Sequence, residues 1–136
     1  MNSEGNVTQV VPFLRVSDIE ESLAYYVYGL DFEVHNKWVE DGKLRWCWLT
    51  IGGGALMLQQ FSKEGPDAWR PTGKLGEGVS IYFICEDALA IYRYATARGL
   101  PTTKPFVGNG MWVTSLSDPD GYEIIFESPT EDTGGE

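Results

Sequence analysis

The stretch that most constrains the fold of this 136-residue chain is MWVTSLSDPDGYEIIFES, residues 111–128. Its centre, DPDG, has turn chemistry at each position. Proline sets φ, aspartate side chains bond nearby backbone groups, and glycine accepts a positive φ. The residues on either side are mainly apolar, aromatic or β-branched, as strand residues are. The segment therefore predicts two strands joined by a tight turn.

The first half of the sequence predicts a strand, a helix and three more strands. The first strand is expected at residues 7–16, and Pro12 within it cannot donate to a ladder, which indicates an edge or a bulge. Ser17 and Glu20 have the spacing of a capping box that opens a helix, and Gly29 is placed to end that helix. Three strands are then expected at 32–39, 44–51 and 55–61, separated by turns at Asp41-Gly42 and at Gly52-Gly53-Gly54.

The second half repeats this order. A strand is expected at 78–85, Asp87 is placed to cap a helix, and a short strand at 101–106 precedes the hairpin. We therefore expect an α+β fold with one domain at 7–128. Its two βαβββ modules cover 7–61 and 77–128, a loop at 62–76 joins them, and 1–6 and 129–136 form flexible tails.

Composition argues against several classes of function. No apolar run approaches the ~20 residues that span a bilayer, and the N-terminus has no secretory pattern, so we expect a cytoplasmic protein with no membrane partner. A net charge of −10 argues against nucleic-acid binding. The acidic surface either attracts a cationic small molecule or only keeps the protein soluble. Cys47 and Cys85 lie in expected strands and are interpreted as buried free thiols.

Residues 8–128 resemble the vicinal oxygen chelate superfamily, which includes glyoxalase I, extradiol dioxygenases, and fosfomycin- and bleomycin-resistance proteins. The resemblance rests on DPDGY before an apolar strand and on VPFLRVSDIEESLAYYVYGLDF near the start. Asp31 stands where the family usually has glycine, which places a larger residue where a positive φ is expected. The resemblance implies a half-open curled sheet in which two modules enclose a cleft, often completed by a second subunit.

Enzymes of this superfamily hold one divalent metal with His, Glu or Gln side chains from the first and last strands of each module. The matching positions here are Val11, Leu58, Ser80 and Ile125. Three of these residues have aliphatic side chains that cannot bind a metal, and the serine is a poor metal ligand. The single histidine, His35, lies in a strand where the family carries no ligand. We therefore expect no metal, no cofactor and no catalytic residues, and the sequence favours a binding protein over an enzyme.

A metal-dependent lyase or dioxygenase with atypical ligands remains as the alternative. A shift of one residue exchanges the two faces of a strand, which would bring other oxygen donors into play. Those donors, which suit a hard cation, are Gln59, Gln60, Glu123 and Glu127.

What remains is an aromatic-rich cleft, whose rings offer stacking surfaces and cation–π faces. The expected ligand-binding residues are Phe13, Arg15, Trp46, Trp48, Leu56, Leu58, Ser80, Tyr82, Trp112, Ile125 and Glu127. The same aromatic residues also suit a core or a subunit interface. Following the resemblance, Arg15 either binds a ligand carboxylate or pairs internally with Glu127.

The sequence thus predicts a metal-free homodimer of the bleomycin-resistance type. Such a protein would sequester a cationic or aromatic antibiotic in a cleft, with no chemistry performed on it. A binding module with an unrelated ligand, or with a sensory or scaffolding role, is the third class left open, because a fold alone does not define a function.

Overall fold

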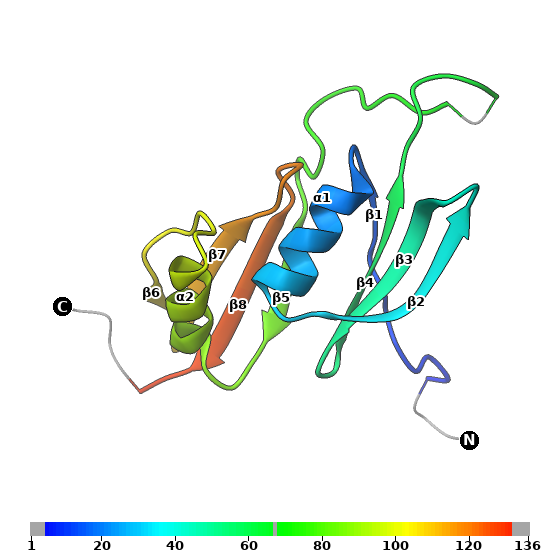
Figure 1. The fold of residues 1–136 in the computed structure, drawn as a ribbon. Helices are drawn as coiled ribbons and strands as arrows, with labels where there is room; N and C mark the ends of the chain where they lie inside the picture. The colour runs from blue at the N-terminus through cyan, green and yellow to red at the C-terminus, as the bar shows by residue number, and fades with distance from the viewer. Residues whose placement is uncertain (1–4, 67, 132–136) are drawn as a thin grey trace.

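Two four-stranded sheets, each with helical structure on one side, make up the computed structural model of residues 5–66 and 68–131 (Figure 1). The first module contains β1 (Phe13–Val16), α1 (Ile19–Leu23), the π-helical segment η1 (Ala24–Gly29), β2 (Glu33–Glu40), β3 (Lys43–Ile51) and β4 (Gly54–Gln60). The second contains β5 (Ser80–Ile84), α2 (Ala88–Ala97), β6 (Phe106–Gly108), β7 (Met111–Ser117) and β8 (Glu123–Pro129). The α+β class and the repeated βαβββ order are confirmed.

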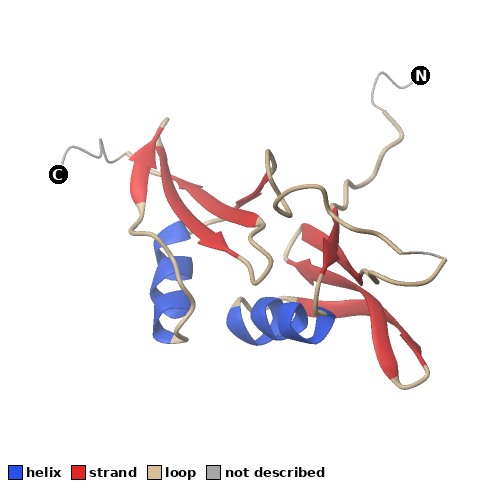
Figure 2. Cartoon of the chain, turned by 90° about the horizontal axis from the view of Figure 1, so that it is seen from above, coloured by secondary structure: helices blue, strands red, loops and turns tan. Residues whose placement is uncertain are grey.

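The two sheets have the same topology. Their strand orders are β1-β4-β3-β2 and β5-β8-β7-β6. In each, the first strand runs parallel to the last and the other neighbours are antiparallel. Seen from above in Figure 2, both helices lie on the same side of the two sheets. In the described residues, no helix is long and apolar enough to cross a membrane.

A chain of aromatic rings joins the cores of the two modules. Phe32, which precedes β2, contacts Tyr26 of η1 with ring centroids 5.3 Å apart. Phe32 also meets Phe83 of β5 edge-on at 5.7 Å, and Phe83 stacks on Phe126 of β8 at 5.3 Å. The helix-covered faces of both sheets therefore share one hydrophobic core.

Several expected element boundaries are wrong. The first strand begins at Phe13 and not at residue 7. Its pairing with β4 starts next to the proline, where Met57 N donates to Pro12 O at 2.8 Å. Asp18, and not Ser17, caps α1, since its carboxylate accepts from two amides of the first turn. The strand expected at 101–106 is reduced to an isolated bridge at Thr102, and β6 follows it.

Other local expectations are confirmed. Asp31 has the positive φ expected at its position, 67°. The DPDG hairpin forms, with Gly121 at φ 95° between β7 and β8. Cys47 is a buried free thiol, and burial raises its pKa to about 11, whereas Cys85 is free but partly exposed. Of the expected tails, residues 1–4 and 132–136 lie outside the described residues.

Candidate functional site

Each sheet buries one face under its helix and leaves the other open. In the first sheet, buried residues such as Leu49 and Leu56 lie on the helix side and belong to the core. Because successive side chains alternate, their neighbours in sequence form the opposite face. We call this the first open face, and it carries Phe13, Arg15, Trp38, Trp46, Trp48, Met57 and Gln59. The second open face carries Ser80, Tyr82, Ile84, Phe106, Ser115, Ser117, Glu123 and Glu127, and Val113 and Ile125 share this face but are buried.

The first open face is a platform of indole rings with a cation at one end. The strand register places four residues in one row, Arg15, Gln59, Trp46 and Trp38. The next row includes Trp48, whose ring lies 5.1 Å from that of His35. Paired residues of neighbouring strands project on the same side, so these indoles lie on one face of the sheet.

Among the described residues, Arg15 contacts aromatic rings and forms no ion pair with a carboxylate. Its guanidinium carbon lies 5.8 Å from the ring centroid of Phe13 and 5.0 Å from that of Trp69, in the loop after β4. In the described residues, the arginines that form ion pairs with carboxylates are Arg45, Arg93 and Arg98. The internal ion pair considered between Arg15 and Glu127 is therefore not formed in this part of the chain.

Trp69 is held over Arg15 by its own loop. Its amide donates to Ser62 O at 2.8 Å, and its ring meets that of Phe61 edge-on at 5.1 Å. Two hollows of about 750 and 490 Å³ adjoin here, and both are lined by Arg15 and Trp69. The first also reaches Ser80 of the second open face. Arg15 and Trp69 thus lie at the junction between the modules.

The second open face is richer in hydroxyl groups and carboxylates. Ser80 Oγ donates to Glu123, and Ser115 Oγ donates to the other oxygen of the same carboxylate at 3.4 Å. Glu127 lies four residues after Glu123 in β8, on the same face, between Ile84 and Val113 in neighbouring strands. The two open faces therefore differ in charge: one carries an arginine and the other two glutamates.

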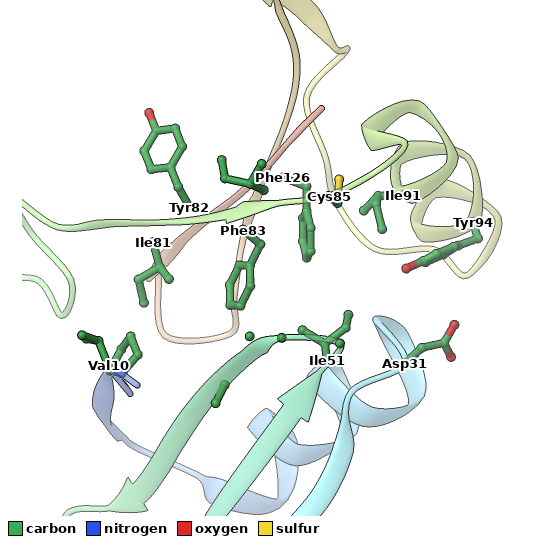
Figure 3. Close-up of a pocket in the computed structure, with 16 residues that line it drawn as sticks. Val10, Asp31, Ile51, Ile81, Tyr82, Phe83, Cys85, Ile91, Tyr94 and Phe126 are labelled. Carbon is green, nitrogen blue, oxygen red and sulfur yellow. The ribbon is translucent and has the colours of Figure 1, made fainter. Parts of the chain in front are cut away.

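Another hollow, of about 880 Å³, lies between the modules on the helix side. Figure 3 shows Ile81 and Phe83 pointing toward Val10 and Ile51, while Tyr82 points away. Its walls are mainly apolar, and the Asp31 carboxylate at its edge is already paired with Arg98 at 3.1 Å. We regard this groove as the seam between the modules.

The residues at the superfamily's metal positions do not fit a divalent ion. Leu58 lies in the core, and its neighbour Met57 faces the open side. The four candidates are then Val11, Met57, Ser80 and Ile125, and none is a histidine or carboxylate. Within the described residues, no three His, Cys, Asp or Glu side chains are grouped closely enough to hold a metal.

The atypical ligand set is divided between faces. Gln60 Oε1 accepts from Ile19 N at 2.9 Å on the helix side, so this glutamine cannot share a site with Gln59. Glu123 and Glu127 share the second open face, but the histidine of this chain lies in the other sheet. The geometry therefore does not bring these donors together around one ion.

Eight of the eleven residues expected to bind a ligand lie on the open faces. The other three are Leu56, Leu58 and Trp112, and their expected position on or beside the cleft is wrong. Both leucines are fully buried and pair with core residues of β3. Trp112 pairs with Ser128 on the helix side and packs against the core. The expectation omitted Met57 and Gln59 from the ligand site, although alternation from Arg15 across the parallel β1–β4 pair identifies both.

Comparison with known families identifies this architecture. The protein-family model of the Glyoxalase/Bleomycin resistance protein/Dioxygenase superfamily matches residues 7–126 of this chain. The chain belongs to this superfamily.

Several solved structures have a similar fold. TnmS3, titled an antibiotic binding protein from Streptomyces sp. CB03234, is 21% identical with a TM-score of 0.73, covering 93% of this chain and all of its own. TioX from Micromonospora sp. ML1 is 18% identical with a TM-score of 0.67, covering 93% and 99%. A superfamily member from Sphaerobacter thermophilus DSM 20745 is 29% identical with a TM-score of 0.65, covering 89% and 98%. A search of curated proteins finds no match.

Proposed function

We propose that this protein binds a flat aromatic small molecule on its open faces, without a metal and without chemistry on the ligand. The observation that carries this proposal is the row of Trp38 and Trp46 ending at Arg15, a charge with no carboxylate partner in the described residues. Aromatic rings stack favourably on indoles, and a guanidinium receives a carboxylate or similar anion. A cationic substituent would be met by Glu123 or Glu127 on the second open face.

Antibiotic sequestration is the specific form of this function that we favour. The superfamily description names bleomycin resistance, and TnmS3 of similar fold is titled an antibiotic binding protein. The aromatic surface and the donor set unsuited to metal support the same proposal for this chain. Glyoxalase or dioxygenase activity would require a metal to polarise the substrate or activate oxygen, and no step through a metal follows from these residues.

Replacing Trp46 with alanine tests the indole platform. Bleomycin is expected to quench the tryptophan fluorescence of the wild-type protein, and Trp46→Ala is expected to bind it roughly fivefold more weakly, because one stacking contact contributes about 1 kcal/mol. Trp112→Phe, on the core side, is the matched control and should retain wild-type affinity. A titration without quenching would exclude the bleomycin version of the proposal, and equal losses in both variants would contradict the position of the site.

We also propose that the protein is a homodimer whose partner packs over the open faces and leaves the ligand in a cleft between the two subunits. Large apolar side chains are exposed there, notably Tyr82 at 54% and Ile84 at 67%. Surfaces of this kind usually mark an interaction site. We expect a native mass of about twice the chain's 15.2 kDa.

Light scattering after size-exclusion chromatography measures this mass. Ile84→Glu should shift the protein toward monomer, because it puts a charge on the covered face. Val7→Glu, at an exposed apolar residue outside both faces, should leave the dimer intact. A wild-type monomer at 100 µM would contradict the proposal.

A further inference from the structure

The turn at the tip of β7–β8 contacts the first module next to its cation. Ser17, the residue after β1, donates its amide to Asp120 at 3.1 Å and its hydroxyl to the same carboxylate at 2.6 Å. Tyr122 Oη donates to the carbonyl oxygen of Arg15 at 2.6 Å. Two residues of the DPDGY motif therefore bind the last part of β1, where the arginine of the first open face is located.

Tyr122 is itself held in place. Its amide donates to Asp118 Oδ1 at 2.9 Å. Its ring packs against Gly76 of the linking loop, where an added Cβ would lie 2.8 Å from the tyrosine Cδ1. Gly76 also has a φ of +79°, so a side chain there would be strained. Tyr122 is thus a fixed donor between the loop, the turn and β1.

The bond acts on the backbone of Arg15 and not on its side chain. The guanidinium, in contrast, lies over Trp69 and beside Phe13. A small rotation of the Arg15 backbone would move the end of this long side chain away from the indole. Burial raises the pKa of Tyr122, which keeps the hydroxyl protonated and able to donate.

We propose that Tyr122 is a positioning residue for the ligand site. By bonding the Arg15 carbonyl, it holds the guanidinium against Trp69 in the orientation that receives an oxyanion, such as the carboxylate of an aromatic acid. The role of Arg15 as a ligand contact rests on the proposed function. The effect of Tyr122 on the Arg15–Trp69 contact does not, so it is measured separately.

The first measurement needs no ligand. The protein is labelled with 5-fluorotryptophan, and the ¹⁹F resonance of Trp69 is identified by its loss in Trp69→Phe. Tyr122→Phe keeps the ring and removes only the hydroxyl, and it should shift the Trp69 resonance toward its position in Arg15→Gln. The resonance of Trp112, in the core of the second module, should not move. An unchanged Trp69 resonance in Tyr122→Phe overturns the proposal.

The second measurement uses two probes of the same shape, 2-naphthoate and neutral 2-naphthamide. The wild-type protein should prefer the naphthoate about tenfold, and Arg15→Gln should remove that preference. Tyr122→Phe should reduce it to about threefold while its affinity for the naphthamide is unchanged. Ser17→Ala, which loosens the same turn without removing the Tyr122 bond, should keep the full preference.

The results of these two measurements distinguish the positioning role of Tyr122 from the proposed ligand-binding function. Equal weakening of both probes in Tyr122→Phe would mean a general structural role and would overturn the positioning role. If neither probe binds the wild-type protein, the proposed function fails for aromatic acids and amides. The ¹⁹F shift then still decides whether Tyr122 orients Arg15.

Discussion

Replacing Phe32 with alanine is expected to lower the free energy of unfolding by about 4 kcal/mol. Phe32 is only 1% exposed, and its ring lies between those of Tyr26 in the first module and Phe83 in the second. Truncation removes the buried ring and leaves a cavity where the two cores meet. Neighbours from two different sheets cannot close such a cavity without moving the modules. Urea unfolding followed by circular dichroism measures the loss.

Val34→Ala is the matched control, since this residue lies two positions further along the chain and is 44% exposed. Its cost should remain below about 1 kcal/mol. A Phe32→Ala variant that loses no more than the control would show that the modules do not depend on a shared core.

Asp118→Ala is expected to cost about 3 kcal/mol, through the loss of a buried acceptor. Asp118 is a buried residue, 5% exposed. It accepts from Tyr26 Oη at 2.8 Å and from the amides of Asp120 and Tyr122, both at 2.9 Å. Alanine would leave these donors without their partner, and Tyr26 is completely buried. Asp120→Ala is the control. It removes only the carboxylate that accepts from Ser17 in a partly exposed contact, so it should lower the free energy of unfolding by about 1 kcal/mol. Equal losses in the two variants would contradict this account.

The pH dependence gives a second readout for Asp118. Burial raises the pKa of this carboxyl, against the lowering effect of the hydrogen bonds from Tyr26, Tyr122 and Asp120. A carboxyl with a raised pKa in the folded state binds its proton more tightly there than in the unfolded chain. Its contribution to stability is therefore greatest below the unfolded pKa of about 3.9 and is lost as the pH rises through the folded pKa. The stability of wild type relative to Asp118→Asn should increase as the pH falls from 7 to 4, and a decrease would contradict the assignment.

Local signals in the sequence were sufficient for much of the fold. The DPDG turn, the cap at Asp87 and the repeated order of strands and helix all depend on residues close together in the chain, and all are present in the structure. The positive φ of Asp31 was also predictable, because a residue in the usual glycine position at a helix end adopts that conformation. The boundaries were less predictable, since the extent of β1 depends on its pairing with β4, more than forty residues away.

The candidate site, too, was predictable in part from local sequence and in part only from long-range pairing. Alternation in β1 and β3 correctly grouped Arg15 and Phe13, and Trp46 and Trp48, on common faces. In β4 the run GALMLQQ is apolar on both sides at its start, so the local pattern does not distinguish the face of Leu58 from that of Met57. The register with β1 decides this, and it places the leucine in the core.

The sequence by itself therefore determined the family, the order of elements and the absence of histidine and carboxylate side chains at the usual metal positions. Only the tertiary structure decided which face of each sheet is covered, that Arg15 meets Trp69 in place of a carboxylate, and that Tyr122 bonds Arg15 across the modules. The physical reason is that a period of two defines which side chains share a face. The packing of helices and the contacts between distant segments decide which face is buried and which residues meet.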